Sequence, residues 1–175
     1  MIARLAAAAA ALVLAGCAVL APQETPVPSL ASVPTSFEMS GRLAVREGQR
    51  SDIAVLRWTR RGASDIWVIA SPLGNEVARI ESTPTGATLT QAGGPSEEAP
   101  TFAALTRKVL GVALDPDWLA EGLHGKEPPQ LPDGWRFSID ETQPAGAVRL
   151  AKRMTVRKDD TVVRLVVDSY RPLED

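Results

Sequence analysis

The chain has one cysteine, one histidine and one tyrosine among its 175 residues. A single thiol cannot form an intramolecular disulfide, so the fold must be held together by packing alone. One cysteine and one histidine are also too few ligands for a structural zinc site, and we expect neither a metal nor another cofactor. The formal net charge of −2 gives no electrostatic basis for binding nucleic acid.

Motifs for catalysis are also missing. The sequence has no Gly-x-Ser-x-Gly nucleophile elbow and no glycine-rich phosphate loop. The only histidine, His124, lies in a Leu-His-Gly-Lys segment without a nucleophile nearby, so we expect a solvated loop residue there. We therefore do not expect an enzyme.

The N-terminal segment is the most informative part of the sequence. Arg4 is followed by an apolar run of about ten to twelve residues, shorter than the roughly 20 that span a bilayer. The run ends in Leu14-Ala15-Gly16-Cys17, a pattern typical of a lipoprotein signal peptide. We predict that residues 1–16 are cleaved and that Cys17 carries the lipid. An ordinary secretory signal with an unmodified Cys17 and a short uncleaved anchor are the alternatives.

Residues 17–36 separate the predicted lipidation site from the rest of the chain. They contain four prolines and several small polar residues, which predicts an extended tether rather than a segment packed on the domain. Ala18 is compatible with export to the outer membrane, since some bacteria use Asp at this position for retention in the inner membrane. Residues 37–175 then form one globular domain.

The domain begins with strict alternation of inward and outward side chains from Phe37 to Arg46, which predicts a half-buried strand. Residues 93–100 are polar and acidic and are expected to form a loop. Further strands are predicted at 53–60, 65–70, 75–81, 87–91, 135–139, 148–156 and 161–170.

Two short helices are predicted in the middle of the chain. The spacing of apolar residues over 102–110 predicts the first, which Gly111 ends. Asp115 as N-cap and Pro116 at the first helical position predict the second, which we expect Gly122 to end.

This order of elements predicts a mainly β fold with some α structure. The expected architecture is a single curved antiparallel sheet, an open half β-barrel, with a lid of short helices over a hydrophobic cavity. Without the family resemblance described below, the strand residues would fit the core of a closed sandwich better.

Several short segments resemble the family of the outer-membrane lipoprotein receptor LolB. Their order and spacing, together with the predicted lipidation site, carry the resemblance. They are Phe37 with Gly41 to Arg46, the strand around Trp58, Ser71 to Gly74, Ala78 to Glu81, Leu110-Gly111, Trp118-Leu119, Leu131 to Trp135 and Arg164 to Asp168.

The resemblance implies a receptor that faces the periplasm from the outer membrane. It would accept acylated lipoproteins from a periplasmic LolA-like carrier and insert them into the outer membrane among its phospholipids. We expect it to act as a monomer. The alternative is an envelope lipoprotein on a related half-barrel that carries another lipid, or an assembly or structural factor.

The resemblance also implies roles for particular residues. A projecting loop with an exposed leucine would insert into the membrane, and the matching turn is Pro72-Leu73-Gly74. Turn chemistry independently places Leu73 at the tip, although it could fold back onto its own hairpin. The predicted wall of the acyl-chain cavity is Phe37, Met39, Leu43, Val45, Leu56, Trp58, Trp135, Phe137 and Ile139. The predicted face of the lid is Phe102, Leu105, Val109, Trp118 and Leu119.

Overall fold

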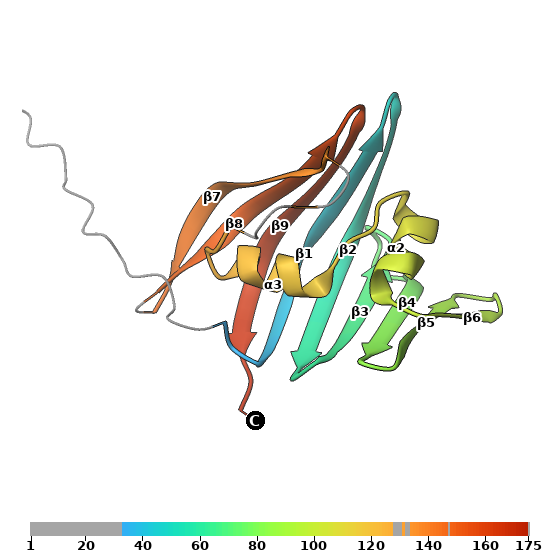
Figure 1. Cartoon of the computed structure of the whole chain (residues 1–175), viewed down its shortest axis with the longest axis horizontal. Helices are drawn as coiled ribbons and strands as arrows, with labels where there is room; N and C mark the ends of the chain where they lie inside the picture. Colours follow the sequence, from blue (N-terminus) through green and yellow to red (C-terminus); the bar gives the residue numbers. More distant parts are fainter. Residues whose placement is uncertain (1–32, 128–130, 132–133, 147, 175) are drawn as a thin grey trace, which may run out of the picture.

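The computed structural model describes residues 33–127, 131, 134–146 and 148–174. Nine strands form one antiparallel sheet, and two helices lie on one of its faces (Figure 1). The predicted signal peptide and lipidation site at Cys17 lie outside the described residues. The elements are β1 (Ser36–Glu47), β2 (Arg50–Arg61), β3 (Ser64–Ala70), β4 (Glu76–Thr83), β5 (Gly86–Gln91), β6 (Ser96–Ala99), α2 (Phe102–Leu110), α3 (Pro116–Leu123), β7 (Arg136–Ala145), β8 (Val148–Lys158) and β9 (Thr161–Pro172).

Most consecutive strands pair as antiparallel hairpins, and one pairing, between β1 and β9, joins strands that are distant in sequence. Their order across the sheet is β6-β5-β4-β3-β2-β1-β9-β8-β7. The first and last long strands, β1 and β9, therefore lie side by side and join the two halves of the sheet. In the described part of the chain the two end strands, β6 and β7, pair with one neighbour each, so the sheet is open. This confirms the predicted open antiparallel sheet with a helical cover.

Both helices begin as their sequences predict. Thr101 caps α2, because its side-chain oxygen accepts the backbone N–H of Ala104, and Gly111 ends the helix with a φ of 73°. Asp115 caps α3 by accepting the N–H of Asp117, and Pro116 begins the helix. Capping predicted the start of α3 because it uses only neighbouring residues, whereas the start of α2 was predicted from apolar spacing and the cap at Thr101 was not identified.

Two of the predicted boundaries are wrong. Residues 93–100 are not only a loop, since Ser96–Ala99 form the short strand β6 against β5. Gly122 does not end α3, which continues to Leu123. Gly122 is needed instead for close packing, because a Cβ at this position would lie 2.9 Å from Cε2 of Phe137 and 3.1 Å from Sδ of Met154, and closer still to Cζ of that phenylalanine.

The core lies between the helices and the covered face of the sheet. Its centre is a group of aromatic rings, in which Phe37 lies edge-on to Trp58 and Trp67 lies edge-on to Phe102 of α2. Every described element begins after residue 33, so a chain that starts at Ala18 keeps the whole core. No helix in the described residues is long and apolar enough to cross a membrane.

Candidate functional site

A notch in the sheet marks the candidate site. Strand β3 ends at Ala70, which pairs with Val55 of β2, so residues 50–54 of β2 pair only with β1. The β1–β2 hairpin therefore projects beyond the turn between β3 and β4 (Figure 1). The C-terminal end of α2 lies over this step, since Val109 and Leu110 line the same space as the hairpin.

A cavity of about 550 Å³ opens at the notch, and we call it the mouth cavity. This volume lies within the roughly 300–1,000 Å³ typical of small-molecule sites. Aliphatic side chains make up most of the wall, and four charged residues also contribute to it. The lining residues are Leu43, Val45, Glu47, Arg50, Asp52, Ile53, Ala54, Ile69, Ala70, Ser71, Pro72, Val77, Lys108, Val109, Leu110 and Gly111.

The turn between β3 and β4 lies at the edge of this cavity. The N–H of Gly74 donates to the carbonyl of Ser71 at 2.8 Å, and Gly74 has a φ of 89°. This is the turn that Pro72 and Gly74 predict, with Leu73 at its tip. Leu73 is 91 % exposed, so it does not fold back onto its hairpin, while Pro72 lines the cavity.

The residues predicted for the cavity wall separate into two groups. Leu43 and Val45 line the mouth cavity. Phe37, Met39, Leu56 and Trp58 are buried in the packed core and are not among its lining residues. Trp135 and Phe137 border a separate small void of about 10 Å³ beside α3, and Ile139 packs against the core.

The predicted face of the lid does lie on the helices' inner side. Phe102, Leu105 and Leu119 are buried, and Val109 reaches the mouth cavity. Trp118 is half-buried and lines the small void next to Trp135. The two helices therefore differ in what they cover: the end of α2 borders an open space, while α3 covers a filled core.

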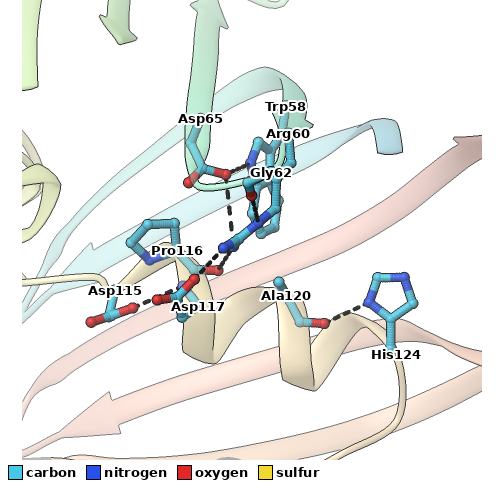
Figure 2. Close-up of polar contacts among 9 residues, drawn as sticks. All are labelled: Trp58, Arg60, Gly62, Asp65, Asp115, Pro116, Asp117, Ala120 and His124. Carbon is cyan, nitrogen blue, oxygen red and sulfur yellow. Dashed lines mark hydrogen bonds and ion pairs between the residues drawn. The ribbon is translucent and has the colours of Figure 1, made fainter. Parts of the chain in front are cut away.

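Polar contacts hold the N-terminal end of α3 to the sheet (Figure 2). Arg60 at the end of β2 forms an ion pair with Asp117 and donates to the carbonyl of Pro116 at 3.1 Å. It also lies 3.8 Å from the buried Asp65, which accepts a 2.7 Å hydrogen bond from the indole of Trp58. Burial raises the pKa of Asp65, an effect that the indole and the guanidinium oppose.

The C-terminal end of α3 is held by the only histidine. His124 is buried, and its Nδ1–H donates to the carbonyl of Ala120 at 2.7 Å (Figure 2). Its Nε2 accepts from the hydroxyl of Tyr170 on β9 at 2.9 Å, which fixes the neutral tautomer. Burial lowers the pKa of His124, with help from the charges of Arg60 and Lys126. The prediction of a solvated His124 is therefore wrong, because the residues next to it in sequence cannot predict that β9 packs against it.

The sequence did not identify several residues of the mouth cavity. Ala54 and Ile69 follow the alternation of β2 and β3, so the strand pattern contained a signal for them. Ile53, Val77 and Lys108 line the cavity because of the notch and the position of α2, which no local pattern reveals.

The mouth cavity and the turn beside it can bind an apolar group and release it through the opening. The wall offers aliphatic surface, Arg50, Asp52 and Lys108 add charged groups to the lining, and the exposed Leu73 lies beside the cavity. Each methylene group that moves from water into such a wall gains about 0.8 kcal/mol.

Comparison with known proteins identifies the family of the chain. The family model of the outer membrane lipoprotein LolB matches residues 35–170. Proteins named outer-membrane lipoprotein LolB are similar over nearly the whole chain. The one from Thiobacillus denitrificans is 33 % identical and covers 90 % of this chain and 91 % of its own. Those from Chromobacterium violaceum and Azoarcus sp. are 31 % and 29 % identical and cover 98 % and 94 % of this chain, and 100 % and 96 % of their own.

A solved structure shows the same fold without close sequence similarity. A DUF1329 family protein from Desulfovibrio piger superposes with a TM-score of 0.53 at 7 % identity, covering 81 % of this chain and 87 % of its own. The open sheet, the helical cover and the match to the family model over most of the described residues lead to one conclusion. The chain belongs to the family of the outer membrane lipoprotein LolB.

Proposed function

We propose that this protein accepts acylated lipoproteins from a periplasmic carrier, holds their acyl chains in the mouth cavity and passes them to the outer membrane. Cys17 carries the lipid that anchors it there. The observation that supports this most strongly is the position of the exposed Leu73 beside an apolar cavity. Binding and release would then take place at the same end of the molecule.

The energy of acyl-chain burial explains why a receiver is needed. At about 0.8 kcal/mol for each methylene, one long acyl chain in water costs on the order of 10 kcal/mol. A receptor must offset this cost and still release the chain to the bilayer. An aliphatic cavity that opens to solvent satisfies both requirements, since it buries a chain only partly and contributes no directional bonds that must be broken.

The exposed leucine supports a separate step of transfer. Burial of one leucine side chain is worth only about 1.5–3 kcal/mol, which is too little to anchor a protein. Leu73 would instead bring the cavity opening into contact with lipid, while the acyl chains on Cys17 keep the protein at the membrane.

A transfer assay tests the proposal. A chain starting at Ala18 is offered a carrier loaded with a labelled lipoprotein, and the label is followed first to this protein and then to added liposomes. The wild type should accept and deliver the label, Leu73→Glu should accept but not deliver, and Ala54→Phe, which fills the mouth cavity, should accept poorly.

The matched control is Ile66→Glu on the surface away from the cavity, which should behave as wild type. If no label moves to the wild type, the receptor function is refuted, and carriage of another lipid or an assembly role becomes the better account. If Ala54→Phe accepts normally, the acyl chains bind elsewhere.

A further inference from the structure

The exposed aliphatic side chains are not spread evenly over the surface. The described residues expose five large ones, and four of these lie around the notch. Ile53 is 61 % exposed, Val55 37 %, Leu73 91 % and Val77 43 %. We call these four residues the apolar rim. The fifth, Ile66, lies four residues before the end of β3, about 13 Å along the strand from Ala70.

The rim is continuous in the sheet and joins the cavity. Val55 pairs with Ala70, the residue before the turn that carries Leu73. Ile53 and Val77 are exposed and also line the mouth cavity. An apolar chain that leaves the cavity would therefore meet rim side chains at the opening, beside the charged residues that also line the cavity.

Two ion pairs lie next to the rim. Arg50 and Asp52 form an ion pair at 2.9 Å beside Ile53, and Arg79 and Glu76 form one at 3.1 Å beside Val77. Such pairs carry little net charge, which lowers the cost of bringing this surface against an apolar phase.

The composition of the rim favours lipid over protein as its partner. Protein-binding hot spots are enriched in Trp, Tyr and Arg, whereas the rim consists of isoleucine, leucine and valine alone. Aliphatic side chains without aromatic or guanidinium groups gain as much from acyl chains as from a protein surface, and need no partner of matching shape.

The tether is long enough for this end of the domain to reach the anchoring membrane. β1 begins at Ser36, at the end of the sheet opposite the notch, and Arg42 pairs with Val55 at the level of the rim. Six residues of strand separate these levels, about 20 Å. The sixteen residue-to-residue steps from Cys17 to Val33 can span up to about 55 Å.

We propose that the whole apolar rim, and not Leu73 alone, is the surface that docks on the lipid bilayer, with the mouth cavity opening onto the membrane. This inference rests on the proposed function for its purpose, but docking can be measured without any cargo.

Single fluorescent labels test the surface directly. Cys17 is the only cysteine, so a chain starting at Ala18 has none, and one cysteine can be placed at Ile53, Leu73, Val77 or, as the control, Ile66. Each variant is labelled with an environment-sensitive dye and mixed with vesicles of phosphatidylethanolamine and phosphatidylglycerol. We expect a blue shift at the three rim positions and none at Ile66. A shift at Leu73 alone would overturn the inference and leave the proposed function intact.

Substitutions then measure the contribution of the rim to binding. Ile53→Ser with Val77→Ser should weaken partition of the unlabelled chain into the same vesicles about tenfold, whereas Ile66→Ser should leave it unchanged. Circular dichroism checks that each variant is folded. If the double variant binds vesicles normally but no longer accepts cargo from the carrier, the rim is a protein-docking surface and the inference is wrong.

Discussion

Gly122 provides a sharp test of how α3 is packed. A glycine inside a helix normally costs about 1 kcal/mol relative to alanine, so Gly122→Ala would stabilise an exposed helix by that amount. Here the added Cβ would lie 2.9 Å from Cε2 of Phe137 and 3.1 Å from Sδ of Met154. Overpacking of this kind costs about 1–3 kcal/mol. The two effects oppose each other, and we expect a net loss of up to about 2 kcal/mol.

A double-mutant cycle separates the two effects. Phe137→Leu removes the ring atoms that the Cβ would meet, at a cost of its own from lost burial. In that background Gly122→Ala should become neutral or stabilising. Urea unfolding of the four proteins, followed by circular dichroism, gives the coupling free energy, which we expect to exceed about 1 kcal/mol. If Gly122→Ala stabilises the otherwise unchanged protein, α3 does not pack closely on β7 and the reasoning is refuted.

Three further changes test the remaining supports of the helices. Arg60→Met should lower the free energy of unfolding by about 3 kcal/mol in urea titrations, since it leaves the carboxylate of Asp65 buried without its cation; an unchanged midpoint would contradict this. The pKa of His124 is lower in the folded than in the unfolded state. As the pH falls, the imidazole is therefore protonated at a higher pH in the unfolded chain than in the folded one. Stability should therefore fall by up to about 1.4 kcal/mol per pH unit as the pH drops below 6.5 towards the folded pKa, and His124→Gln should flatten this slope in thermal melts at several pH values. Thr101→Ala removes the cap of α2 and should cost about 1 kcal/mol by the same urea assay, whereas Thr101→Ser should cost little.

The sequence predicted most of the strands and helix starts because those signals are local. Alternation from Phe37 to Arg46 identifies a strand from the period of its side chains, and Asp115 with Pro116 identifies a helix start from capping. β6 escaped prediction because it is short and acidic, and because its one strand partner in the described residues is β5. Gly122 has the same sequence context as a helix end, and only the ring of Phe137 gives it another role.

The candidate site was predictable in part for the same reason. Turn residues place Leu73 at a tip, and the structure confirms its exposure. Alternation identifies Phe37 and Leu43 as inward-facing, but it cannot tell a residue inside a filled core from one beside an open space. That difference depends on where β3 ends relative to β2 and on which helix lies above, and both are set by contacts distant in sequence. The roles of these residues in binding and delivery stay predictions.

Among the described residues, the end strands β6 and β7 each pair on one side only, which matters for a protein on a crowded membrane. Strands with free backbone groups can template association with further chains, and anchored proteins meet one another often. Both margins carry features that discourage this. β6 presents Glu97 and Glu98, and β7 combines register irregularities around Glu141 with Pro144, which lacks a backbone donor. The sheet can thus remain open, without closing into a barrel, and still resist edge-to-edge aggregation.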